Sequence, residues 1–193
     1  MSENLSALEL LRTRRSAKIL TLDEPGPNED QIKAIIEIGA RVPDHGKLVP
    51  WRFILFRGAA RAEFGEILAE RYSKIESRAT DASLKIEAGR FLRAPVVIGI
   101  VSRARPHPKI PEFEQLLSAA AAAMNILHAA TALGFGAVWV TEWYAYDVEI
   151  ARALRLAEHE KMIGFIYIGT RTVPNDERPR PVIEDIVADW TRP

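Results

Sequence analysis

The spacing of apolar side chains along the chain predicts both helices and strands. In several stretches apolar residues recur three and four positions apart, as they do along one side of a helix. These stretches are residues 7–15, 28–39, 61–78, 84–92, 112–133 and 148–154. In other stretches β-branched and aromatic residues form short apolar runs, which are typical of strands buried in a sheet. These runs are residues 51–56, 96–101, 137–141 and 162–168.

The order of these elements favours an α+β fold. Helices and strands mix without the strict alternation that a doubly wound sheet requires. The chain has 193 residues, which suits one domain or one subunit of a compact dimer. It contains no internal repeat, low-complexity tract or long linker. We therefore expect residues 1–193 to form a single domain.

The helix predicted at residues 112–133 is unusually apolar. Residues 116–141 include no Asp, Glu, Lys or Arg, but alanine supplies much of the apolarity and Gly134 divides the stretch. A buried helix followed by a core strand fits this pattern better than a membrane span. Such a helix must be covered on nearly every side, and at 1.5 Å per residue it is about 33 Å long. Packing against its own copy across a two-fold axis would cover it, and we favour this homodimer over a helix wrapped by its own chain.

Composition excludes several classes of chemistry. The chain has no cysteine, so disulfides, thiol catalysis, thiolate zinc sites and iron–sulfur clusters are excluded, and redox chemistry would need a bound cofactor. Twenty-six basic residues balance 26 acidic residues, which gives no overall field to attract nucleic acid or a membrane surface. The four histidines lack the spacing of metal ligands. The N-terminus does not resemble a signal peptide, and we expect the protein in the cytoplasm.

Nucleotide-binding and hydrolase motifs are absent. The chain has no G-x-G-x-x-G between a strand and a helix, and Gly46-Lys47 is not followed by the Ser or Thr of a P-loop. It also has no G-x-S-x-G nucleophile elbow. These functions therefore have no positive support in the sequence.

Basic residues gather at the end of the first predicted helix. Arg14, Arg15, Ser16 and Lys18 lie within five residues, and their guanidinium, hydroxyl and ammonium groups could bind one phosphate. The alternative is a solvated basic helix end that complements the helix dipole. Arg178-Pro179-Arg180-Pro181 forms a second basic segment, or an ordinary solvated turn.

Two further segments carry candidate binding residues. Arg41 and His45 lie on a loop constrained by two prolines and a glycine, where binding residues are often found. The alternative is that Asp44 and His45 only bond the loop to itself. Trp139-Val140-Thr141 ends a predicted core strand, where the indole either packs in the core or borders a flat aromatic cofactor.

Together, these four segments resemble the nitroreductase family of FMN-dependent oxidoreductases over nearly the whole chain. The family motif R-x-S-x-[KR] is similar to residues 14–18, and the flavin-loop motif A-P-S-x-x-N-x-Q-P-W to residues 42–51. The glycine-rich entry to a W-x-T strand is similar to residues 134–141, and the late K/R-P-R-P to residues 178–181. The likeness is greatest to the short subgroup with P-D-H in the loop. The resemblance implies a mixed or antiparallel sheet flanked by helices in an intertwined homodimer.

The resemblance also implies roles for the basic segments. Arg14, Arg15 and Ser16 would hold the phosphate and ribityl end of FMN, with Arg180 assisting at the phosphate. Lys18 would reach the pyrimidine edge of the flavin.

The other two segments would complete the flavin site. Arg41 and His45 would contact FMN from the second subunit, so each site would need both chains. Trp139, Val140 and Thr141 would line the isoalloxazine ring.

The implied activity is ping-pong transfer of hydride from NADH or NADPH to a nitroaromatic, a quinone or a similar small acceptor. The flavin would carry the chemistry, and no catalytic side chain is expected. Other possibilities are a relative specialised for another flavin reaction, a flavin store or redox sensor without turnover, and a helical interaction module without cofactor. Two departures from the family pattern matter: Asp44 and His45 replace small and amide residues, and Glu142 stands where many relatives have glycine.

Overall fold

A computed structural model describes residues 6–192; residues 1–5 and 193, the ends of the predicted domain, lie outside it. The helices are α1 (Ala7–Thr13), α2 (Glu29–Gly39), α3 (Ala59–Ile75), α4 (Asp81–Ala88), α5 (Glu112–Ala132) and α6 (Val148–Ala153). The strands are β1 (Leu22–Asp23), β2 (Trp51–Arg57), β3 (Val96–Ser102), β4 (Gly136–Val140) and β5 (Lys161–Arg171). Short 3-10 turns are η1 (Ile19–Thr21), η2 (His45–Lys47), η3 (Arg90–Arg93), η4 (Trp143–Ala145) and η5 (Ile183–Asp185).

The predicted helices and core strands are confirmed, with two differences. The expected helix at 84–92 is two elements: α4 begins earlier, where Thr80 and Ser83 form a capping box, and η3 follows it as a separate turn. Strand β1 was not expected, because two residues are too few to show an alternating pattern.

The sheet is antiparallel throughout. Strand β5 pairs with β3 and with β4, and β3 also pairs with β2. Because Ile166 of β5 is paired with Ile98 of β3 and with Trp139 of β4, β3 and β4 lie on opposite sides of β5. Within the described chain β2 and β4 are therefore edge strands, as is the two-residue β1, which pairs only with the end of β5. One side of β4 is left without a strand partner.

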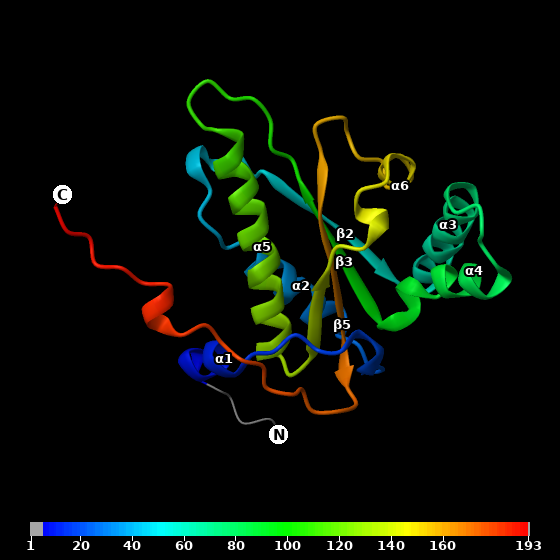
Figure 1. Ribbon diagram of the computed structural model, residues 1–193, viewed down its shortest axis with the longest axis horizontal. Helices are drawn as coiled ribbons and strands as arrows, with labels where there is room; N and C mark the ends of the chain where they lie inside the picture. The colour runs from blue at the N-terminus through cyan, green and yellow to red at the C-terminus, as the bar shows by residue number, and fades with distance from the viewer. Residues whose placement is uncertain (1–5, 193) are drawn as a thin grey trace.

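Helices cover both faces of this sheet (Figure 1). Isoleucines and alanines of α2 and α5 pack on one face, with Ile35 and Ile126 fully buried. The other face carries an aromatic core beneath α3, α6, η3 and η4, in which Phe91 and Phe165 are fully buried. Burial on both faces explains why β3 is an unbroken apolar run.

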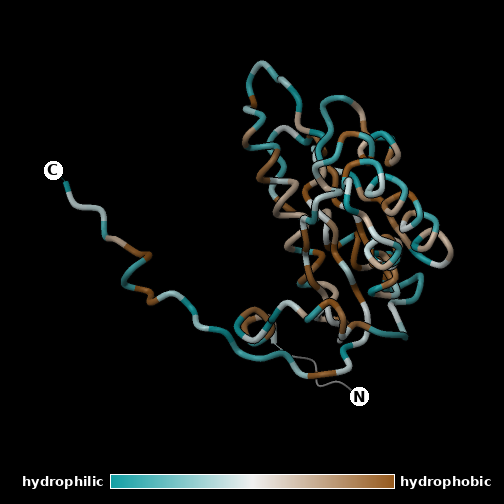
Figure 2. The backbone as a smooth tube through the Cα atoms, turned by 45° about the vertical axis from the view of Figure 1, so that its right-hand side comes forward, coloured by the Kyte–Doolittle hydropathy of each residue, from teal (hydrophilic) through white to brown (hydrophobic). Residues whose placement is uncertain are grey.

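Two apolar surfaces have no partner within residues 6–192. The outer side of α5 exposes Phe113 and Leu117. The chain after β5 passes α1 and then extends away from the rest of the molecule, with hydrophobic residues along it (Figure 2). On this C-terminal arm, residues 172–192, Trp190 is 83% exposed and Ile186 63% exposed. Exposed apolar surface is typical of sites of protein association. No helix in residues 6–192 combines the length and apolarity needed to cross a membrane.

Candidate functional site

Four arginines from the two ends of the chain gather beside β4. Arg14 follows α1 in an extended conformation, and the backbone N–H of Ala17 donates to the carbonyl of Ala137 on β4 at 3.0 Å. From the C-terminal arm, the Asn175 side-chain amide donates to the carbonyl of Arg15 at 3.4 Å. These bonds bring Arg178 and Arg180 within electrostatic reach of Arg14 and Arg15. We call Arg14, Arg15, Arg178 and Arg180 the arginine cluster.

The arginine cluster holds more positive charge than the carboxylates of residues 6–192 neutralise. Partial burial and the charges of Arg180, Arg15 and Arg178 lower the pKa of Arg14 below its usual value. Burial and the charges of Arg180 and Arg178 also lower the pKa of Arg15. The carboxylate of Glu177 contacts Arg15 and lies 3.6 Å from the Nε atom of Arg180. The carboxylate of Glu177 therefore lies where the arginines attract an anion.

An unpaired donor points to a larger anion than one carboxylate. The Nε–H of Arg15 is buried and has no hydrogen-bond acceptor within the described residues. A buried donor without an acceptor is costly, and a phosphate offers several strong acceptor oxygens to guanidinium groups. The donor set and the charge of the arginine cluster thus fit a phosphate group.

Residues around the cluster extend the polar surface. Ser16 is exposed, and the Lys18 ammonium group lies 2.7 Å from Asp176, with both side chains exposed. His128 of α5, which the sequence did not single out, also belongs here: burial and the charge of Arg14 lower its pKa. His128 lies in the helix that was expected to be covered on nearly every side. The sequence could have singled it out, because residues 116–141 contain no other basic residue.

The three residues predicted to line a flat cofactor lie along β4 and its end. The indole of Trp139 lies over Gly164 of β5 and donates to the carbonyl of Ile163 at 3.2 Å. Val140 packs in the aromatic core on the other face, whereas Thr141 is exposed. The Trp139 and Val140 side chains therefore pack against the sheet. At these positions a ligand could contact the backbone on the side of β4 that has no strand partner.

The predicted binding loop is fastened to α5 by polar side chains. His45 and Glu114 are joined at 2.8 Å, the Ser118 hydroxyl donates to the carbonyl of Pro43, and the Asn125 amide donates to the carbonyl of Arg41 at 2.9 Å. Residues 114, 118 and 125 are four and seven positions apart, so they lie on one side of α5. The sequence carried this signal, because they are polar positions in an alanine-rich helix.

The loop and the arginine cluster lie at opposite ends of α5. Glu114, which holds His45, is in the first turn of the helix, whereas His128 near Arg14 is close to its end. Fourteen residues of helix separate the two positions, or about 21 Å at 1.5 Å per residue. In Figure 1, α1 accordingly lies beside the lower end of α5. One chain alone does not bring Arg41 and His45 to the arginine cluster.

A second charged group lies at the far end of β4. The carboxylate of Glu142 accepts from Arg90 at 2.8 Å and from Arg93 at 3.0 Å. Glu87 binds Arg90 through two bonds and accepts from the Trp143 indole at 2.9 Å. We call Glu87, Arg90, Arg93 and Glu142 the paired cluster, because each guanidinium faces carboxylates. It was not predicted from the sequence.

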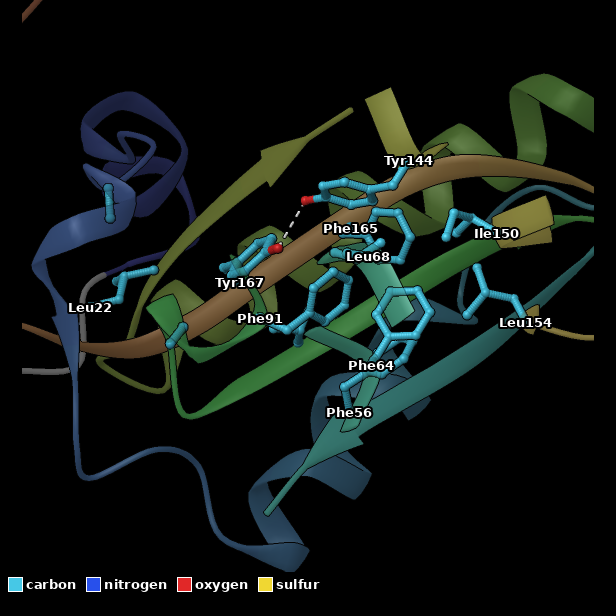
Figure 3. Close-up of a cluster of buried hydrophobic side chains, with 13 residues drawn as sticks. Leu22, Phe56, Phe64, Leu68, Phe91, Tyr144, Ile150, Leu154, Phe165 and Tyr167 are labelled. Carbon is cyan, nitrogen blue, oxygen red and sulfur yellow. Dashed lines mark hydrogen bonds between the residues drawn. The ribbon is translucent and has the colours of Figure 1, made fainter. Parts of the chain in front are cut away.

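Two tyrosines extend the paired cluster into the aromatic core. The Tyr144 hydroxyl donates to Glu142 at 2.6 Å and lies 3.0 Å from that of Tyr167; Figure 3 shows the two hydroxyl groups pointing toward one another among the aromatic rings. Burial raises the pKa of Tyr144 and of Tyr167. Burial opposes the charge of Glu142, but hydrogen bonds from Arg93 and Tyr144 outweigh it and lower its pKa.

The paired cluster explains how glutamate is accommodated at position 142. Its backbone is extended (φ −77°, ψ 175°), so the position does not need the left-handed conformation that favours glycine. The side chain turns to Arg90 and Arg93. The Glu142 carboxylate is thus paired with Arg90 and Arg93 at the end of β4.

Comparisons with known proteins identify the family. The model described as the nitroreductase family matches residues 11–170. The chain belongs to the nitroreductase family. The YdjA protein of Escherichia coli (strain K12), provisionally named as an NAD(P)H nitroreductase, is 34% identical over 166 residues, which cover 86% of this chain and 88% of YdjA.

Solved structures agree with the nitroreductase assignment. A nitroreductase-like family protein from Bacillus cereus has a TM-score of 0.81 at 20% identity and covers 98% of each chain. A provisionally assigned nitroreductase from Desulfovibrio desulfuricans, solved in complex with FMN, has a TM-score of 0.71 at 25% identity and covers 96% of this chain and 97% of its own. The α+β, nitroreductase-like fold expected from the sequence is confirmed.

Proposed function

We propose that this nitroreductase-family chain binds FMN and uses it to transfer hydride from NADH or NADPH to small oxidised acceptors such as nitroaromatics or quinones. The observation that carries the proposal is the arginine cluster, with its excess charge and its buried, unpaired Arg15 donor beside the free edge of β4. The Desulfovibrio desulfuricans structure, solved in complex with FMN, and the name of YdjA support the same cofactor and reductant.

Each part of the site has a role in holding the cofactor. Arg14, Arg15 and Arg180 would bind the phosphate, with Ser16 beside them at the ribityl end. Lys18 would face the pyrimidine edge of the ring, and its positive charge would favour the reduced, anionic form. The ring itself would lie along the free edge of β4, where the backbone of residues 139–141 is open to a ligand.

The remaining residues would come from a second copy of the chain. If two copies pack their α5 helices antiparallel about a two-fold axis, the His45 end of one helix meets the His128 end of the other. Arg41 and His45 then approach the arginine cluster of the partner, about 21 Å from that of their own chain. The exposed apolar side of α5 and the apolar C-terminal arm supply surface for such a homodimer.

Bound FMN would supply the hydride chemistry, accepting hydride at N5 and passing it to an acceptor that occupies the same place after the nicotinamide leaves. The chain's own groups then bind and orient. The arginine cluster fixes one end of the cofactor, β4 supports its ring, and the partner's loop closes the site.

Absorption spectroscopy and stopped-flow mixing test this function. The purified protein should be yellow, release FMN on heating, lose its visible absorbance when mixed with NADH or NADPH, and regain it when a quinone is added. A flavin that resists both reductants would contradict the enzymatic proposal in favour of a store or sensor. A protein that neither carries nor takes up FMN would contradict the cofactor assignment.

A further inference from the structure

Asp44 uses its whole carboxylate within the predicted binding loop. One oxygen accepts the backbone N–H of Leu48 at 3.0 Å, and the other accepts the N–H of Val49 at 2.9 Å. Both oxygens are therefore engaged by the loop itself. Asp44 is placed to shape the loop and not to bind a cofactor directly.

The hydrogen bonds that Asp44 accepts hold a backbone conformation that the sequence disfavours. Gly46, Lys47 and Val49 all have positive φ angles, of 73°, 54° and 48°. Glycine adopts such angles freely, but a β-branched residue such as Val49 is strained there. Without Asp44, Val49 would relax toward extended angles and the loop would change shape.

The shaped loop presents His45 outward. Its side chain is 64% exposed and reaches Glu114 on the first turn of α5. Behind it the loop is seated closely, since a Cβ atom on Gly46 would stand 2.4 Å from Ile110. The outward position of His45 thus depends on the turn that Asp44 closes.

We propose that Asp44 is a positioning residue of the flavin site that acts through His45: by bonding Leu48 and Val49 it holds His45 where the partner subunit's flavin can meet it. This inference rests on the proposed function, in which His45 contacts FMN. In the P-D-H sequence, the aspartate then forms the turn and the histidine faces the ligand.

A double-mutant cycle tests the inference. FMN affinity is measured by fluorescence titration of apoprotein for wild type, Asp44→Ala, His45→Ala and the double variant. We expect Asp44→Ala to weaken binding by about tenfold or more. The double variant should bind nearly as well as His45→Ala alone, because residues that act as one unit give non-additive losses.

Three further variants sharpen the result. Val49→Gly in the Asp44→Ala background should recover part of the affinity, because glycine adopts the positive φ angle without strain. The matched control is Glu76→Ala, which removes a carboxylate that accepts the Arg78 N–H at 2.9 Å in a different loop, and it should leave FMN affinity unchanged. Asp44→Asn, which keeps one acceptor, takes the place of Asp44→Ala should that variant not fold.

Each outcome has a separate meaning. Unchanged affinity in Asp44→Ala, or losses that simply add to those of His45→Ala, would overturn the positioning role while leaving the flavin site intact. Wild-type protein without measurable FMN binding would instead contradict the proposed function itself.

Discussion

The arginine cluster and the paired cluster lie at the two ends of β4. Their arginines differ in how far carboxylates balance their charge. In the paired cluster, Arg90 and Arg93 face the carboxylates of Glu87 and Glu142. In the arginine cluster, the carboxylate of Glu177 pairs with two of the four guanidiniums, those of Arg15 and Arg180, and a buried donor of Arg15 has no acceptor within residues 6–192. In the proposed function, the matched arginines stabilise the fold, whereas the unmatched ones bind the phosphate of the cofactor.

This contrast gives β4 a fixed end and an open end. Glu142 ties the strand end to η3 through Arg90 and Arg93. At the other end, the bond from Ala17 to Ala137 brings the arginine cluster alongside. A ligand lying along β4 would therefore meet a rigid support under its ring and unsatisfied charge at its phosphate.

Removing one partner of the paired cluster should have the largest effect. Glu87→Gln removes the more buried of the two carboxylates that Arg90 faces, so we expect the free energy of unfolding to fall by about 3 kcal/mol. Urea denaturation of the apoprotein measures this loss. The same substitution at Glu70, which forms an exposed pair with Lys74 on α3, should leave the unfolding midpoint unchanged. Equal effects at the two positions would contradict the distinction between matched buried and exposed pairs.

Arg14→Ala should affect the ligand and spare the fold. We expect FMN affinity to fall by about ten- to a hundredfold, the range for a lost charge-assisted hydrogen bond. The apoprotein should be no less stable, because the remaining arginines repel one another less. Fluorescence titration and urea denaturation measure the two quantities, with Arg152→Ala on the surface of α6 as control. An unfolding midpoint that drops with unchanged affinity would reverse the assignment.

Acid should weaken the paired cluster by a smaller amount. The pKa of Glu142 lies below its ordinary value in the folded chain, so its contribution to stability is present above the unfolded pKa of about 4.3 and is lost as the pH falls through the folded pKa. We expect the urea midpoint of wild type to decline below about pH 4. Glu142→Gln should be less stable at neutral pH and should show a shallower decline. A variant with the full wild-type pH dependence would show that Glu142 does not titrate as described.

The sequence predicted the fold where local patterns decide it. The apolar run of β3 and the capped start of α2 at Asn28 are visible within a few residues. The paired cluster was missed because Arg93 and Glu142 meet across 49 positions of chain, and no local pattern links them. The two-residue strand β1 was missed because it has no pattern of its own.

The sequence predicted the residues of the candidate site but not how they come together. The sequence singled out the residues of the arginine cluster, and their convergence is seen only once β5 returns the C-terminal arm to α1. It left open whether Asp44 and His45 bond the loop to itself; Asp44 does so, whereas His45 turns to Glu114. That the loop and the arginines lie at opposite ends of α5 depends on the three-dimensional path of the chain.

The most direct test is the FMN stoichiometry of a mixed dimer that carries Arg14→Ala in one chain and His45→Ala in the other, purified through two different tags. If each site takes Arg14 from one copy and His45 from the other, one site keeps both residues and the other loses both. Titration should then show one tightly bound FMN per mixed dimer. Two equally weakened sites would contradict the account, because each chain would then be building its site alone.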